Sequence, residues 1–239
     1  MNRKRNTLYC FSPPVMILTM IIEVALAIYA LVRFKHTLLR NLAIATFLLL
    51  AFFQFAEFQV CANTLGNPEL WSRFGYAAIT LLPVLGVHVI SSISHRHNRQ
   101  LLIALYSISI AFALFFISTP DAIGMTRCTG RYVLFSLQPA IASMYYLFYS
   151  TVLLIGTGLA IVNFRNEKRQ NIRHAYIWFV VGSLAFCLPT GIIYILRPSS
   201  LDSLPSIMCG FAVLFAFVLG LRVLPLVGKQ NTPVRNKTR

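Results

Sequence analysis

The chain is organised as long apolar runs separated by short polar connections. Each run is close to the length of about 20 mostly apolar residues that a helix needs to cross a bilayer. None of them alternates polar and apolar positions, as the strands of a membrane barrel do. The runs cover residues 15–32, 42–61, 71–93, 101–118, 139–162, 175–196 and 204–224. This pattern predicts an all-α polytopic membrane protein, a seven-transmembrane helix bundle.

Composition supports a membrane protein and leaves little room for anything else. Of 239 residues, 57% are hydrophobic and 11% are charged, against about 45–50% apolar and about 25% charged in soluble domains. A water-soluble globule is therefore excluded. Because the spans use most of the chain, we expect residues 1–227 to form one seven-helix membrane domain without a separate soluble domain. Residues 228–239 are polar and basic, and we expect them to be a disordered cytoplasmic tail.

The formal net charge is +15, and the basic residues lie in the tails and connections. The side that holds the C-terminus carries fourteen Lys and Arg residues and the other side carries seven. The positive-inside rule therefore predicts an outer N-terminus and an inner C-terminus, although the basic N-terminal tail favours the reverse. No basic stripe is interleaved with aromatic residues, so we expect contact with anionic lipid headgroups at the inner loops rather than with nucleic acid.

The cysteines gather on the side predicted to be outside. Cys10, Cys61, Cys128 and Cys209 lie there, and Cys187 lies within a span. An oxidising exterior permits disulfides, and sequence alone cannot choose among the pairings. Cys61 with Cys128 is the preferred pair, because it would tie the loop after the fourth run to the end of the second. The alternative is that all are unpaired thiols.

Glu23 lies near the middle of the first run. The residues on its helical face are small, apolar or weakly polar: Met16, Thr19, Met20, Ala27 and Ala30. No Lys or Arg occurs at that depth in any run, so we expect the carboxyl group to be protonated or hydrogen-bonded to a Thr, Tyr or Gln. Glu23 is either a proton relay or ligand anchor or, as we favour, a structural hydrogen bond between helices.

Glu57 lies about one turn from the outer end of the second run and shares its helical face with Gln54 and Cys61. At this depth, water could reach the carboxylate. One interpretation is a polar pocket that is open to the outside and binds a cation or a small polar ligand. The other is a solvated carboxylate paired with Arg73 or Arg127.

His88 lies in the inner third of the third run. With His95, His97 and His174 it would suggest a metal or haem, but those three lie in basic connections at headgroup level. A zinc or haem site needs ligands that converge at one depth, so we expect no metal and no cofactor. All five lysines lie in tails or connections, which excludes a retinal Schiff base.

Three short motifs resemble a known family. Cys10-Phe11-Ser12 precedes the first run, Gln54-Phe55-Ala56-Glu57 lies in the second and Pro83 in the third. In these motifs the chain resembles a family of uncharacterised bacterial seven-helix membrane proteins that open with Cys-Phe-Ser. More distantly, the stretch from Trp71 to Pro83 is similar to the seven-helix sensory region ahead of some membrane histidine kinases. The resemblance implies a multi-pass protein of the bacterial inner (plasma) membrane and brings no established activity.

Three functions remain open. The leading hypothesis is a receptor-like sensory module that takes its signal near Gln54 and Glu57. It would pass the change through the basic inner loop 165–173 and the tail to a separate cytoplasmic signalling partner. The alternative is transport of a small solute or a proton along Glu23, Glu57 and His88. The third, an intramembrane enzyme acting on lipid, needs a nucleophile or metal triad at one depth. We cannot assemble one, so we lean against an enzyme.

Overall fold

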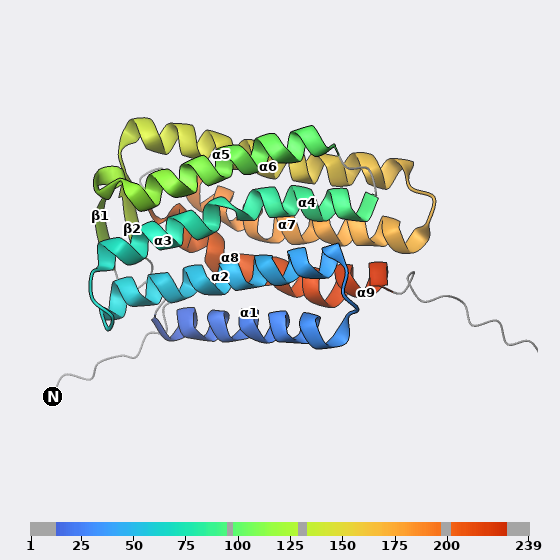
Figure 1. Ribbon diagram of the computed structural model, residues 1–239, viewed down its shortest axis with the longest axis horizontal. Helices are drawn as coiled ribbons and strands as arrows, with labels where there is room; N and C mark the ends of the chain where they lie inside the picture. Colours follow the sequence, from blue (N-terminus) through green and yellow to red (C-terminus); the bar gives the residue numbers. More distant parts are fainter. Residues whose placement is uncertain (1–12, 95–97, 129–132, 197–201, 229–239) are drawn as a thin grey trace, which may run out of the picture.

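The computed structural model describes residues 13–94, 98–128, 133–196 and 202–228. Figure 1 shows the helices running side by side, with a small β-hairpin at one end of the bundle. The helices are α1 (Pro13–Arg33), α2 (Leu38–Ala62), α3 (Pro68–Thr80), α4 (Leu82–Ser94), α5 (Arg99–Ser118), α6 (Pro139–Asn166), α7 (Gln170–Leu196), α8 (Leu204–Val218) and α9 (Leu224–Gly228). They form seven stretches long and apolar enough to span a membrane, with α3–α4 as one and α8–α9 as another. The predicted all-α seven-helix fold is confirmed.

Side-chain caps fix the ends of several helices. Thr37 precedes α2 and its hydroxyl accepts from the backbone N–H of Arg40, which satisfies one of the free N–H groups of the first turn. Asn98 does the same before α5. Asn63 ends α2 and Asn67 begins α3, both with positive φ, so the chain reverses within a few residues. Polar residues thus mark the helix boundaries that the apolar runs only approximate.

The third span is broken into α3 and α4 at Leu81. Pro83 has no N–H to donate to the carbonyl of Ile79, and the Leu81 N–H bonds three residues back to Ala78 instead of four. The helical pitch therefore changes just before this proline. Pro189, in contrast, lies within α7, which continues past it to Leu196.

The hairpin is a feature that the sequence analysis did not expect. After a short 3-10 turn, η1 (Pro120–Ala122), strand β1 (Ile123–Cys128) pairs antiparallel with β2 (Val133–Leu137). Alternate residues of β2 are buried, namely Val133, Phe135 and Leu137. The alternation is hard to see in the sequence because Leu134, which lies between them, is also apolar.

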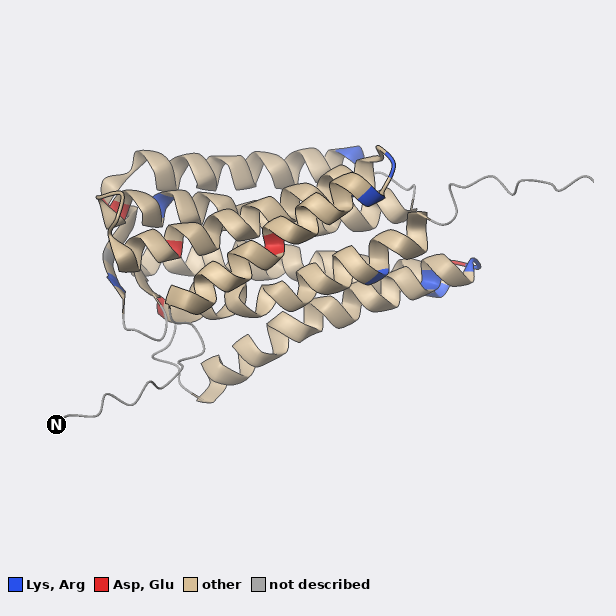
Figure 2. Ribbon diagram, turned by 90° about the horizontal axis from the view of Figure 1, so that it is seen from below, with Lys and Arg blue, Asp and Glu red and all other residues tan. Residues whose placement is uncertain are grey.

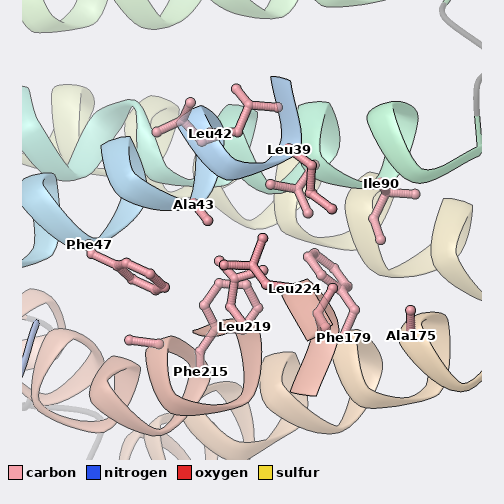
Figure 3. Packing of buried hydrophobic residues seen from close by; sticks show 14 of the residues in the cluster. Leu39, Leu42, Ala43, Phe47, Ile90, Ala175, Phe179, Phe215, Leu219 and Leu224 are labelled. Atoms are coloured by element: carbon pink, nitrogen blue, oxygen red, sulfur yellow. The ribbon is translucent and has the colours of Figure 1, made fainter. Parts of the chain in front are cut away.

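An apolar cluster fills the bundle at the end away from the hairpin. It joins α1, α2, α4, α7 and α8, and Figure 3 shows Phe47, Phe179, Phe215 and Leu219 meeting there. Leu219 belongs to a π-helical turn, η3 (Leu219–Val223), between α8 and α9. Gly220 in that turn lets the backbone approach α1 and α2, since an added Cβ would lie 3.3 Å from Leu26 and 3.4 Å from Phe47.

The outer surface of the helices is apolar. Leu114 on α5 and Leu147 and Leu154 on α6 are 60%, 70% and 73% exposed. Figure 2 shows Lys and Arg residues near the ends of the bundle and not along its sides. An apolar girdle between charged ends is the surface that a lipid bilayer covers.

Candidate functional site

The two intramembrane carboxyl groups are both buried inside the bundle. α1 packs on α2, and Glu23 and Glu57 are 0% and 1% exposed. Glu57 lies close enough to Glu23 to act on it electrostatically. The face of α1 predicted to contact other helices does so, because Met16, Thr19 and Ala27 are also buried. Because Glu57 is buried, the interpretation that it is a solvated carboxylate is wrong.

The site has unused hydrogen-bonding capacity. Both carboxyl oxygens of Glu23, Oε1 of Glu57 and Nε2 of Gln54 are buried without a partner among the described residues. The hydroxyl of Thr19, the nearest threonine on α1, is occupied by its own helix at the carbonyls of Val15 and Met16. Unpaired buried polar groups are costly. They mark a position where a proton, a water or a ligand would be stabilised.

Ser206, in the first turn of α8, connects Glu57 to the hairpin. Its hydroxyl donates to the Glu57 carboxylate and accepts from the backbone N–H of Val133 on β2 at 3.3 Å. A second contact ties β2 to the residues just before α8, since the Ser136 hydroxyl donates to Asp202 at 2.9 Å. A displacement of β2 would therefore change the hydrogen bonding of a carboxylate inside the membrane domain.

A disulfide also joins the hairpin to α2. Cys61 and Cys128 are bonded, with their Cα atoms 5.2 Å apart, and this is the pair that the sequence analysis preferred. Cys61 lies one turn beyond Glu57 on α2. Cys187 and Cys209 are free thiols, and Cys10 lies outside the described residues. Glu57 is thus linked to the hairpin through the backbone of α2 as well as through Ser206.

Aromatic side chains form a second buried cluster in the hairpin half of the bundle. Four rings pack against one another there, those of Tyr76, Phe116, Phe135 and Tyr145. The hydroxyl groups of Thr80 and Tyr145 are hydrogen-bonded at 3.2 Å. The second cluster of buried residues therefore mixes rings and hydroxyl groups, and the hairpin residue Phe135 is part of it.

His88 lies in a different environment from the carboxylates. Its Nδ1 is 3.0 Å from the hydroxyl of Tyr106 on α5. Together with Arg99, His88 and Tyr106 line a surface pocket near the start of α5. The structure thus brings together Glu23, Gln54 and Glu57 of the four predicted site residues and pairs His88 with Tyr106 instead. His95 and His97 lie outside the described residues.

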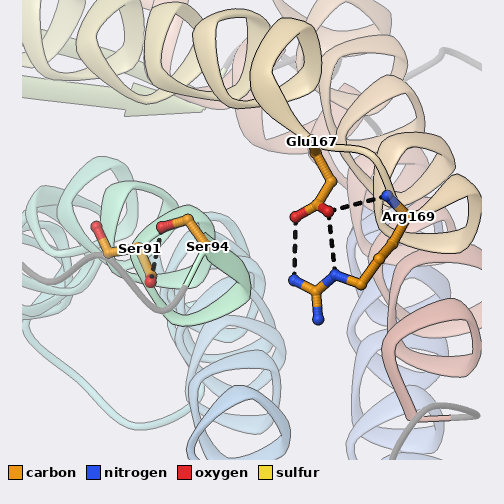
Figure 4. A network of polar contacts seen from close by, with 4 residues as sticks. All are labelled: Ser91, Ser94, Glu167 and Arg169. Carbon is orange, nitrogen blue, oxygen red and sulfur yellow. Dashed lines mark hydrogen bonds and ion pairs between the residues drawn. The ribbon is translucent and has the colours of Figure 1, made fainter.

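The end opposite the hairpin is basic. Nine Lys and Arg residues lie there among those that the structure describes, namely Arg33, Lys35, Arg40, Arg99, Arg165, Lys168, Arg169, Arg173 and Arg222. Arg73 and Arg127 lie at the hairpin end. In the connection after α6, Glu167 pairs with Arg169 at 3.0 Å (Figure 4). This hydrogen-bonded guanidinium lowers the pKa of Glu167 to about 2, so the loop keeps both charges at neutral pH.

Two residues that connect the hairpin to Glu57, Ser206 and Val133, were not predicted from the sequence. A serine at the start of an apolar run is ordinary, and its importance comes from a strand that lies 73 residues earlier in the chain. The alternation in β2 was the available signal, but it covers only five residues.

Comparison with known proteins agrees with this architecture. A family model described as the N-terminal 7TM region of histidine kinase matches residues 15–222, which include parts of all seven spans. No curated protein matches the chain. The family match bears out the more distant of the two resemblances and leaves the Cys-Phe-Ser motif, which falls outside the described residues, as an expectation. The chain is a multi-pass membrane protein and belongs to the family of N-terminal seven-transmembrane regions of histidine kinases.

Proposed function

We propose that this chain is a sensory membrane module in which the hairpin receives an outer signal and the buried carboxylates convert it into a change of helix packing. The observation that carries the proposal is the link from the Val133 N–H through the Ser206 hydroxyl to Glu57. The family to which the chain belongs is consistent with a sensory role. The receiver of the change would be a histidine kinase domain or protein on the cytoplasmic side.

Helix packing offers a route across the membrane. Ser206 lies at the start of α8, and this helix continues through η3 into α9 at the basic end. α8 also packs against α1 and α2, which carry Glu23 and Glu57. A change in the Ser206–Glu57 contact would therefore shift the helix that reaches the opposite end, where the kinase would respond.

The proposed orientation places the hairpin outside and the basic end inside. Among the described residues, nine cations at one end against two at the other favour this direction. Cysteine substitutions at the exposed positions Glu69 and Lys168 test it with a membrane-impermeant maleimide. Labelling of Glu69→Cys alone in intact cells is expected, and labelling of Lys168→Cys alone would reverse the proposed orientation.

The test of signalling perturbs the hairpin by reducing the disulfide that joins it to α2. Native membranes that carry the chain with its kinase are treated with an impermeant reductant, and histidine phosphorylation is measured before and after. Reduction of Cys61–Cys128 is expected to change the phosphorylation level, because it frees β1 from α2. Ser206→Ala is expected to remove most of this change, since the hydroxyl link to Glu57 is lost.

Ser183→Ala provides the matched control. Ser183 is also a buried serine of the bundle, but its hydroxyl bonds to the carbonyl of Phe179 in its own helix. This variant should keep the wild-type response. If reduction leaves phosphorylation unchanged, or if Ser206→Ala and Ser183→Ala behave alike, the proposed route from hairpin to carboxylate is wrong.

The transport alternative receives less support. It requires Glu23, Glu57 and His88 to form one path, whereas His88 is paired with Tyr106 in the pocket near α5. Proton flux into liposomes that Glu23→Gln abolishes would favour it over sensing.

A further inference from the structure

A pocket separate from the carboxylate pair lies between α6, α7 and α8 in the hairpin half of the bundle. Its volume is about 440 Å³, within the range of about 300–1,000 Å³ that is usual for small-molecule sites. Ile79 from the end of α3 also lines it. The pocket is therefore large enough for a ligand of drug-like or lipid-fragment size.

The described lining favours an uncharged ligand. Its described residues are aliphatic, aromatic, hydroxyl-bearing or sulfur-bearing, and none of these is Lys, Arg, His, Asp or Glu. Taking a charge out of water into such a site would be costly without a counter-ion. Four tyrosines, Tyr145, Tyr146, Tyr149 and Tyr194, supply polar atoms along an otherwise apolar wall. The lining thus fits an uncharged molecule with an apolar body and a hydrogen-bonding oxygen.

Tyr149 is the best placed of these tyrosines to bind the ligand's oxygen. The Tyr145 hydroxyl is already hydrogen-bonded to that of Thr80, whose own proton is donated to the carbonyl of Tyr76 at 2.7 Å. The Thr190 hydroxyl donates to the carbonyl of Phe186. The Tyr149 hydroxyl forms no hydrogen bond with the residues that the structure describes. It can donate to an oxygen that enters the pocket.

The pocket opens toward the bilayer. Leu154 on α6 and Tyr194 on α7 line it and are 73% and 41% exposed, and both lie within membrane spans. Gly191 lies on the same wall, and a Cβ added there would meet no atom within 4 Å. A ligand would therefore enter sideways from the lipid, between α6 and α7.

The pocket also borders the interior of the bundle. Tyr149, Met208 and Cys209 line both this pocket and a smaller central cavity of about 50 Å³. Cys209 is close enough to Glu57 and Glu23 for their charges to act on it. A bound molecule would thus contact a residue that neighbours the carboxylate pair.

We propose that this pocket binds an uncharged, lipid-soluble molecule that carries a hydroxyl or carbonyl oxygen, taken from the bilayer between α6 and α7 and bound by Tyr149. The claim that binding alters signalling rests on the proposed function. The claim that the pocket binds such a molecule does not rest on it. The two are tested separately, because the experiment below measures occupancy alone and needs no kinase.

Photolabelling in liposomes tests the site. The full chain is reconstituted and exposed to a diazirine derivative of decanol, and the labelled peptides are mapped by mass spectrometry. Labels are expected on the pocket-facing stretches of α6 and α7. Unlabelled decanol is expected to compete about fivefold better than decane, the ratio that one net hydrogen bond provides.

Two substitutions at glycines give a matched pair. Gly191→Phe should fill the pocket without a clash and reduce labelling strongly. Gly158→Phe places the same side chain on α6, where a Cβ also meets nothing within 4 Å and which is not part of the pocket lining. It should leave labelling as in the wild-type protein. Thermal stability of both variants, measured in the same liposomes, shows whether either has failed to fold.

Tyr149→Phe tests the hydrogen bond without changing the shape of the pocket. It should keep the labelled positions and remove the preference for decanol over decane. The proposal is overturned if labels spread evenly over the lipid-facing helices, if Gly191→Phe and Gly158→Phe label equally, or if the wild-type protein shows equal competition by decanol and decane. Equal competition would mean that the pocket holds only bilayer acyl chains.

Discussion

The two halves of the bundle differ in the polarity of their buried residues. Away from the hairpin, the buried cluster around Phe47, Phe179 and Leu219 consists of apolar residues and one tyrosine. In the hairpin half, the buried residues include Glu23, Gln54 and Glu57, and several of their polar atoms have no partner in the described part of the chain. The apolar cluster needs no hydrogen bonds in a membrane. The polar cluster contains buried groups that can still form them.

This difference suggests that the two halves respond differently to a signal. An apolar cluster has one close-packed arrangement and transmits movement as a rigid body. A polar cluster with unmet hydrogen bonds has alternative arrangements of similar energy, which a proton, a ligand or a moving strand can select. We interpret the hairpin half as the part that changes and the other half as the part that carries the change.

The largest effect on stability is expected in the apolar half. Phe47→Ala should destabilise the protein by about 2–3 kcal/mol, less than the about 3–5 kcal/mol of water-soluble cores, because the surrounding lipid is itself apolar. Leu48→Ala is the control, since Leu48 is the next residue and is 49% exposed. Unfolding in a detergent titration measures both. Equal losses would show that the cluster is no better packed than the lipid-facing surface.

A smaller effect is expected at the disulfide. Cys61→Ser is expected to cost about 2 kcal/mol, at the low end of the usual range, because membrane insertion already restricts the segment between the two cysteines, which are 67 positions apart. The loss should appear first as faster proteolysis of the hairpin. Mass spectrometry of alkylated protein with and without reductant shows whether the bond forms, and a protein with four free thiols at positions 61, 128, 187 and 209 would contradict the pairing.

The polar half should tolerate the removal of a charge. Glu57→Gln keeps the shape of the side chain and one oxygen for Ser206, so we expect a change in stability of less than about 1 kcal/mol. Its effect on kinase output should be much larger than its effect on stability. A thermal unfolding curve together with histidine phosphorylation in the same membranes measures the contrast, and a large loss of stability would make Glu57 a structural residue.

The smallest effect belongs to the surface pair in the connection after α6. Because Arg169 holds the pKa of Glu167 at about 2, below its ordinary value of 4.5, the pair stabilises the folded loop above about pH 4.5. That contribution is lost as the pH falls through about 2. Arg169 is 48% exposed, so the effect should stay below about 1 kcal/mol. Glu167→Gln should remove this part of the pH dependence in thermal unfolding, and an unchanged acid profile would show that the pair contributes nothing.

The sequence by itself determined the membrane architecture. Apolar length decides whether a helix spans a bilayer, and this property is local, so all seven spans could be predicted to within a few residues of the structure. The same holds for the buried face of α1, because the three- and four-residue spacing of its small and polar residues follows from helical geometry.

Only the tertiary structure decided what the polar residues contact. Glu23 and Glu57 were recognisable as costly residues in a span, but their proximity depends on how α1 packs on α2. The Ser206 link joins segments far apart in the chain, and the lateral pocket is a gap left by three helices. Such contacts depend on the relative rotation and position of whole helices, which no local pattern of residues specifies.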